Sequence, residues 1–218
     1  MEQNSRVAEP EARNSLAEAT LRRVLDFAMA SALLLVSLPL GLVLCLVLRA
    51  ESPGPIFFRQ SRRGQSYRPI RIFKFRTLRH GAPDPHEGYE MTARDPRITR
   101  VGALLRRTSL DELPQLLNVL RGEMSLVGPR PLDDWESERC LSAHARRFAV
   151  KPGLTGLAQV SGRNALSFRS RAELDVEYVR FRTLALDLSI LFRTPAVLIS
   201  GRGLYPAQAA TDDSTRWD

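Results

Sequence analysis

The sequence is poor in the residues that build disulfide frameworks and transition-metal sites. Among 218 residues there are only two cysteines, Cys45 and Cys140, and three histidines, and neither type shows metal-ligand spacing. A G-x-x-x-x-G-K-[ST] phosphate loop and a strand-led G-x-G-x-x-G motif are both absent. These absences argue against a disulfide-stapled fold, a zinc site and a Rossmann-type cofactor site, and they indicate a reducing compartment.

Lysine is also scarce, although the chain is strongly basic. Lys74 and Lys151 are the only lysines, so the formal net charge of +8 comes almost wholly from arginine. Arginine binds phosphate groups bidentately, which fits phosphorylated substrates, anionic lipids or nucleic acid. The arginines are spread along the chain and no nucleic-acid-binding motif occurs, so we expect no nucleic-acid partner. A membrane-anchored, arginine-rich nucleic-acid-binding protein without catalysis remains the alternative.

One long apolar run, VLDFAMASALLLVSLPLGLVLCLVL, occupies residues 24–48. As a straight helix it would reach about 37 Å, which exceeds a hydrocarbon core of about 30 Å. It is too long for a signal peptide, and no convincing small-residue cleavage site follows it. Membrane insertion is favoured over a buried core helix, because helices of soluble proteins seldom lack a polar face for so long.

A proline interrupts this run. Pro39, beside Ser37, should kink the helix and leave arms of about 22 Å and 14 Å, neither of which can cross the membrane alone. Arginines flank both ends of the run, so both ends favour the cytoplasmic side. We therefore expect a re-entrant helix that enters one leaflet and returns, with Asp26 at headgroup depth and paired with Arg22 or Arg23. A straight span with a kink remains open.

The remainder predicts an α+β fold: a mainly helical, membrane-associated domain with a small β-hairpin and the proline-broken re-entrant helix at its N-terminal end. The hairpin is expected from residues 57–60 and 69–77, with a turn at 63–65. Lys74, on the second strand, is either an ordinary snorkelling lysine or one that faces a phosphate. A helix is expected at 97–107. The chain divides into an N-terminal extension (1–20), the re-entrant membrane helix (21–50), the main domain (51–200) and a C-terminal tail (201–218).

Two adjacent acids, Asp111 and Glu112, begin a leucine-rich helix in the stretch TSLDELPQLLNVLRGEMSLVGPRPL. Ser109 and Glu112 have the spacing of a capping box, and with Asp111 as the cap Pro114 would fall in the first turn. Gly122 predicts the end of the helix. From the local sequence alone, capping is favoured over catalysis. The stripe expected to face the core comprises Leu113, Leu116, Leu117 and Leu120.

Several features around the two acids suit a phosphate. Arginines end the helix expected before them, and their charge would hold both acids ionised at neutral pH. Arg130 lies between two prolines, which restrict the backbone on both sides of it. Its guanidinium would therefore lose little conformational entropy on binding a ligand. The segment KPGLTGLAQVSGRN holds three glycines that would let backbone amides approach an anion, although turn formation alone explains any one of them. An irregular loop is expected at 81–88, and the apolar segment 184–200 is expected as core or as an in-plane interfacial helix.

The ordered motifs from residue 22 to residue 194 resemble the bacterial sugar transferases, the monotopic polyprenyl-phosphate phosphoglycosyl transferases. The resemblance rests on the proline-broken apolar helix together with PGPIFFRQSRRG, IFKFRTL, RRTSLDELPQLLNVLRGEMSLVGPRPL, KPGLTGLAQVSGR and LDVEYVRFRTLALDLSILFRT. Each motif is weak alone, and the six together in this order are specific. The chain resembles the minimal type of the family.

The resemblance implies transfer of a sugar 1-phosphate from a nucleotide diphosphate sugar, usually a uridine one, to a membrane polyprenyl phosphate. This would be the first membrane step of glycoconjugate synthesis, at the cytoplasmic face of the bacterial inner membrane. Asp111 would be the nucleophile that forms a covalent phosphosugar intermediate and releases UMP, with Glu112 as its partner and Mg²⁺ held at Asp111. Membrane lipids are implied partners, and homo-oligomerisation is left open.

The resemblance also assigns positions outside the acid pair. Asp26, Ser37 and Pro39 fall in the implied membrane element. The implied substrate-binding residues are Lys74, Arg106, Arg130, Gln159, Arg163 and Asp175.

Overall fold

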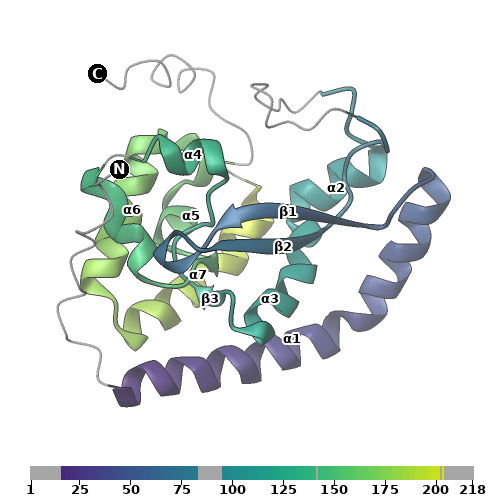
Figure 1. Cartoon of the computed structure of the whole chain (residues 1–218). Coiled ribbons are helices and arrows are strands. Elements are labelled where there is room, and N and C mark those ends of the chain that lie inside the picture. The colour runs from purple at the N-terminus through teal and green to yellow at the C-terminus, as the bar shows by residue number, and fades with distance from the viewer. Residues whose placement is uncertain (1–15, 83–94, 141, 202, 204–218) are drawn as a thin grey trace.

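The computed structural model describes residues 16–82, 95–140, 142–201 and 203. These residues form a mainly helical domain with two small two-stranded sheets, and a long N-terminal helix runs along one side of it (Figure 1). The α+β, mainly helical expectation is confirmed at this level. Most of the N-terminal extension, most of the irregular loop expected at 81–88 and most of the C-terminal tail lie outside the described residues.

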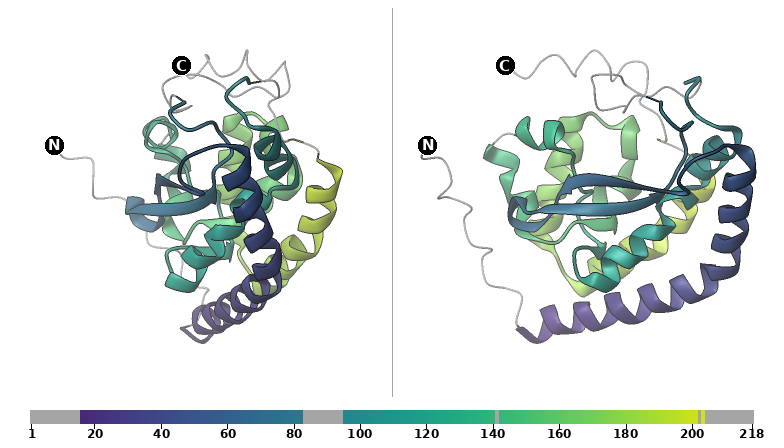
Figure 2. Two further views of the ribbon diagram at one scale, coloured as in Figure 1. Left: turned by 90° about the vertical axis from the view of Figure 1, so that its right-hand side faces the viewer. Right: turned by 45° about the vertical axis from the view of Figure 1, so that its right-hand side comes forward.

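The long helix, α1, spans Leu16–Glu51 and thus takes in the end of the expected N-terminal extension. Pro39 lies inside it, and the helix changes direction in its second half (Figure 1 and Figure 2). Because proline has no amide hydrogen, the carbonyl of Leu35 loses its helical partner, and a bend follows. The Ser37 hydroxyl donates to the carbonyl of Leu34 at 3.2 Å, one turn before the bend.

Helix α1 leaves most of its apolar side chains uncovered. Only Arg22, Ala30, Leu44 and Leu48 are buried, and 11% of its most apolar window lies inside the protein. Among the described residues it is the one helix long and apolar enough to cross a membrane. A core helix of a soluble protein would be mostly buried, so α1 presents an extended apolar surface that favours a non-aqueous neighbour. Its large exposed side chains in the apolar run include Leu33, Leu35, Val36, Leu38, Leu42, Val43, Leu46 and Val47.

The predicted β-hairpin is confirmed. Strands β1 (Phe57–Arg63) and β2 (Pro69–Phe75) pair antiparallel through the short helix η1 (Gln65–Tyr67), and β1 is longer than expected. Ile72 and Lys74 share one face of β2, as the alternation predicts. Ile72 is buried in the core, and Lys74, which lies on the same inward face of the strand, donates a hydrogen bond to Glu112.

The acid pair lies on a 3₁₀ helix between two α-helices. Helix α2 (Arg100–Thr108) ends at Ser109, which adopts a left-handed conformation with φ 56°; η2 (Leu110–Gln115) and α3 (Leu116–Arg121) follow. Neither Ser109 nor Asp111 caps a helix through its side chain, so both capping interpretations are wrong. Ser109 ends α2 and begins η2 through its backbone, since its carbonyl accepts from the Glu112 amide, while its hydroxyl accepts from Arg163 instead of capping the helix.

The ends of α3 and its leucine stripe agree with the sequence in most respects. Gly122 ends α3 with φ 79°, as expected. Leu116 is fully buried, and Leu113 and Leu120 pack against the core, but Leu117 is exposed and does not belong to it. Leu113 contacts both hydrophobic clusters of the domain. The acid-bearing helix is therefore fixed between two packed regions.

The second half of the domain contains a parallel strand pair that the sequence analysis did not predict. Strands β3 (Ser125–Val127) and β4 (Gly153–Thr155) pair in parallel, with Ser125 opposite Gly153. A Cβ atom on Gly153 would lie 2.0 Å from the amide nitrogen of Gly128, and the Gly153 amide already donates to the carbonyl of Pro129. At this position the glycine serves close packing of backbones, not an anion.

Between β3 and β4 lie two short helices, α4 (Asp134–Glu138) and η3 (Ser142–Ala149). Two more short helices follow β4, namely α5 (Leu157–Ser161) and η4 (Arg163–Ala165). The longer helices α6 (Phe168–Phe181) and α7 (Leu184–Ser200) come after them. Helix α7 continues through Pro195. One side of α7 buries Ile190 in the core, whereas Leu188, Phe192 and Ile199 are exposed, so it is amphipathic.

The expected pairing of Asp26 with an arginine of its own helix is wrong. Its carboxylate accepts hydrogen bonds from the Ser125 hydroxyl at 2.7 Å and the Leu126 amide at 2.9 Å, both in β3. Arg22 pairs instead with Asp187 of α7, and Arg23 donates to two carbonyls at the end of α3. Strand β3 is only three residues long and was not predicted, so its hydroxyl and amide were not considered as partners of Asp26.

Removing the Asp26 carboxylate should therefore loosen the attachment of α1. Asp26→Ala leaves a buried amide and hydroxyl without their acceptor, and we expect the free energy of unfolding in detergent to fall by about 1–3 kcal/mol. Asp134→Ala, which removes an exposed carboxylate paired with Arg63, is the matched control and should change it by less than about 0.5 kcal/mol. Denaturant titration measures both variants. Equal effects would contradict an anchoring role for Asp26.

Candidate active site

Glu112 is held by two cations from different parts of the chain. Lys74 of β2 donates to Glu112 Oε1 at 2.8 Å, and Arg130, from the turn after β3, donates to the same oxygen at 3.3 Å. Burial by itself would raise the pKa of Glu112, but the charges of Lys74 and Arg130 and the hydrogen bond from Lys74 outweigh it and hold the pKa well below its usual range. Glu112 is therefore ionised at physiological pH.

Asp111 differs from its neighbour in having no hydrogen bond. Its side chain is 8% exposed, and no donor from the described part of the chain reaches the carboxylate. Burial, opposed by the charge of Lys74 and reinforced by that of Glu112, raises the pKa of Asp111 to about 6. At neutral pH the group is thus mostly ionised, as the sequence predicts, but it is poorly solvated and its oxygens are free to react or to bind a cation.

This environment predicts a stability that depends on pH. The pKa of Asp111 rises from 3.8 to about 6 on folding, so wild-type protein should lose stability as the pH rises through that window. Above it, Asp111→Asn should be more stable than wild type by up to about 3 kcal/mol. The gain should largely disappear below about pH 3, where the carboxyl group is neutral in both the folded and the unfolded protein. Urea unfolding in the presence of a chelator at both pH values checks this; a gain that is independent of pH would contradict it.

Two further predicted arginines flank the start of η2. Arg106 of α2 donates from Nε to the Thr77 hydroxyl at 2.8 Å, and Arg163 of η4 donates to the Ser109 hydroxyl at 3.0 Å. The charge of Arg106 lowers the pKa of Asp111. Burial and the charge of Arg130 lower the pKa of Arg163, and the charges of both acids partly offset that shift. The structure therefore brings Lys74, Arg106, Arg130 and Arg163 together around the acid pair.

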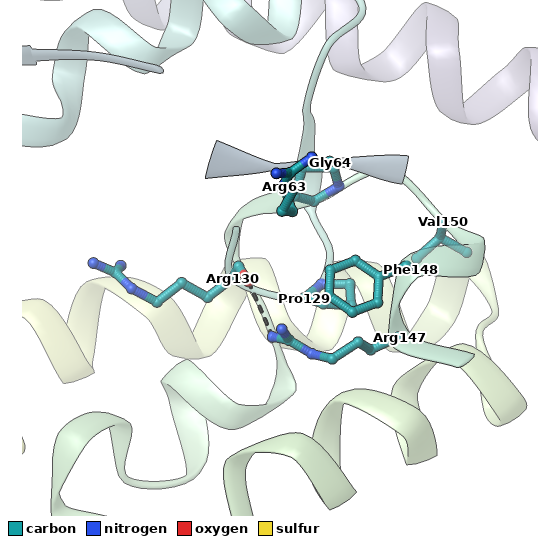
Figure 3. A pocket seen from close by; sticks show the side chains of 8 residues that line it. Arg63, Gly64, Pro129, Arg130, Arg147, Phe148 and Val150 are labelled. Atoms are coloured by element: carbon teal, nitrogen blue, oxygen red, sulfur yellow. Dashed lines mark hydrogen bonds between the residues drawn. The ribbon is translucent and has the colours of Figure 1, made fainter. Parts of the chain in front are cut away.

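Asp175 and Gln159 lie differently. Asp175 is 2% exposed and forms an ion pair with Arg147, which also donates to the backbone carbonyl of Arg130 at 3.0 Å (Figure 3). The guanidinium of Arg130 points away from Phe148 in this view. Asp175 is thus linked to Arg130 through Arg147, and no contact joins it to the two acids among the described residues. Gln159 keeps both amide atoms buried without a partner among the described residues.

A small open depression adjoins Glu112. Its volume of about 10 Å³ gives room for about one water molecule. It is lined by Arg62, Ile72, Lys74, Glu112, Gln115, Arg130 and Pro131. Arg62 and Gln115 are residues that the sequence analysis missed. Strand alternation could have found Arg62, which shares the face of Ile70 and Lys74 in the hairpin register. Gln115 ends the acid-bearing helix and had no distinguishing signal.

The carboxylate of Asp111 fits a magnesium ion. Among the described residues no group of three or more histidine, cysteine or acidic side chains converges. Magnesium, however, is commonly held by one or two carboxylates together with substrate phosphates. Asp111 offers two unbonded oxygens, whereas Oε1 of Glu112 is already shared by two cations.

The described residues thus place a buried carboxylate pair among four cations, in a domain that also carries a long exposed apolar helix. The sequence model of the bacterial sugar transferase family matches residues 17–201, and the chain belongs to that family. It is accordingly a transferase, as the sequence motifs imply.

Named relatives agree with this assignment. The chain is 44% identical to the UDP-glucose:undecaprenyl-phosphate glucose-1-phosphate transferase of Caulobacter vibrioides, over 84% of this chain and 72% of that protein. It is 42% identical to the exopolysaccharide production protein ExoY of Rhizobium meliloti, over 84% and 88%. It is 39% identical to the UDP-galactose-lipid carrier transferase of Erwinia amylovora, over 85% of this chain but 42% of that protein.

Proposed function

We propose that this protein transfers a sugar 1-phosphate from a uridine diphosphate sugar to a polyprenyl phosphate, giving a polyprenyl-diphosphate sugar and UMP. The single observation that carries the proposal is the buried, unbonded carboxylate of Asp111 among four cations. The names of the relatives, which specify UDP-glucose, UDP-galactose and undecaprenyl phosphate, support the substrate classes.

The proposed reaction has two displacements at one phosphorus. An oxygen of Asp111 attacks the sugar-bearing phosphorus, the bond from that phosphorus to the bridging oxygen breaks, and UMP leaves with the electron pair. An oxygen of the polyprenyl phosphate then attacks the same phosphorus and releases the Asp111 carboxylate. The soluble donor and the lipid acceptor therefore need not occupy the site together.

The surrounding charges suit this chemistry. Lys74 and Arg130 neutralise Glu112 and present donors at the edge of the site, where they would bind phosphate oxygens as negative charge builds on them. Arg106 and Arg163 add positive charge near the start of η2, where they are held by the hydroxyls of Thr77 and Ser109. Magnesium, bound by Asp111 and substrate phosphates, would supply further charge neutralisation at the phosphorus.

The exposed apolar surface of α1 accounts for access to a lipid substrate. In the proposal α1 enters the cytoplasmic leaflet of the bacterial inner membrane, bends at Pro39 and returns, so the acid pair lies at headgroup depth. Single cysteines at Leu16 and Gln60, in a chain with Cys45 and Cys140 replaced, test this in sealed vesicles with an impermeant maleimide. Labelling of both from one side is expected, and labelling from opposite sides would replace the re-entrant arrangement by a span.

Covalent trapping tests the reaction itself. Enzyme with magnesium and no acceptor should release one UMP per active site and retain label from a donor labelled in its sugar phosphate. A donor labelled in uridine should leave no label on the protein. Peptide mapping should place the adduct on the segment that contains Asp111. UMP formation only after acceptor is added, without a protein adduct, would instead favour direct attack by the lipid phosphate.

A further inference from the structure

The depression beside Glu112 contains two polar side chains that the proposed reaction leaves unused, Arg62 and Gln115. Arg62 is paired with Asp133 and Glu136. Gln115 is 3% exposed and lines this depression. The described residues give its carboxamide no hydrogen bond, and its amide atoms reach the open depression instead of being sealed in the core. Such a group is explained when a ligand completes its hydrogen bonds.

The depression has the size and lining expected for one hydroxyl of the donor. Its volume of about 10 Å³ gives room for about one water molecule, and a hydroxyl is of similar size. Ile72 and Pro131 supply aliphatic walls, and the heads of Lys74 and Arg130 supply donors. No aromatic ring is among its lining residues, so a uracil base would find no stacking partner there.

The chemistry of the amide decides which part of the donor it meets. A carboxamide both donates and accepts, which matches a hydroxyl group, whereas phosphate oxygens only accept and have Lys74 and Arg130 nearby. Gln115 lies four residues after Asp111 on the same short helix, so a donor with its phosphorus at Asp111 has a neighbouring group within reach. Resting on the proposed function, we infer that Gln115 binds a hydroxyl of the donor sugar and determines sugar specificity.

The test couples a side-chain change to a substrate change. Gln115→Met keeps the volume and removes the hydrogen bonds. The kcat/KM for UMP release is measured with UDP-glucose, UDP-galactose and monodeoxy analogues of UDP-glucose, each lacking one hydroxyl. Wild type should lose about 10- to 100-fold with one analogue. Gln115→Met should show that loss with UDP-glucose already and little further loss with the same analogue.

Controls separate this role from folding and from the reaction as a whole. Gln65→Met removes an exposed amide that donates to the Ala149 carbonyl in the hairpin turn, and it should behave as wild type. Gln115→Asn, which is shorter by one methylene, replaces the Met variant if that does not fold. An equal loss with every donor, or no loss, overturns the role of Gln115 while wild-type turnover stands. No UMP release by wild type with any uridine diphosphate sugar overturns the proposed function as well.

Discussion

Asp111→Asn should transfer sugar phosphate at least about a thousandfold more slowly than wild type while remaining folded. Asparagine keeps the shape of the side chain, but its amide cannot form the acyl phosphate that a carboxylate oxygen forms. Both half-reactions should fail, because the first makes the intermediate that the second consumes. Release of UMP from labelled donor and appearance of labelled lipid measure the two steps.

Two further substitutions test whether this loss of turnover is specific to Asp111. Glu112→Gln keeps the nucleophile and removes the charge that Lys74 and Arg130 share, so we expect a smaller loss, of about a hundredfold. Asp134→Asn neutralises an exposed carboxylate of α4 and should turn over as wild type does. If Asp111→Asn also kept wild-type turnover, Asp111 would not be the nucleophile.

Local patterns were sufficient where one segment determines its own structure. Strand alternation placed the hairpin and put Lys74 on the face of Ile72, and Gly122 marked the end of α3. Pro39 predicted the bend of α1, because the missing amide hydrogen acts within one helical turn. The acid pair could be selected as the site through the ordered motifs of the family, not through its local sequence.

Contacts between distant segments could not be read in the same way. The parallel pair of β3 and β4 joins two three-residue strands, which are too short to show alternation. The acceptor role of Asp26 depends on that pair, so the sequence pointed to the arginines beside it instead. The turn at Ser109 displaced the expected helix cap for a similar reason: a single left-handed residue overrides a favourable spacing.

Asp175 is the assignment on which family pattern and geometry differ most, and its environment suggests a positioning role. Its carboxylate and the guanidinium of Arg147 are almost fully buried, at 2% and 3% exposure. Arg147 in turn holds the backbone carbonyl of Arg130, whose side chain reaches Glu112. A buried cation that loses its only charged partner is strongly destabilising, because nothing else compensates its desolvation.

Asp175→Ala should therefore lower the free energy of unfolding by about 3–5 kcal/mol. Glu173→Ala on the same helix removes an exposed pair with Arg169 and should change it by no more than about 0.5 kcal/mol. Adding Arg147→Met to Asp175→Ala removes the stranded charge, so much of the lost stability should return. Because Arg147→Met also removes the hydrogen bond to the Arg130 carbonyl, UMP release should not recover with stability if Asp175 acts only through Arg147. In that case the double variant and Arg147→Met alone should release UMP equally slowly, and a further loss on removing Asp175 from the Arg147→Met background would show that Asp175 contacts the substrate directly.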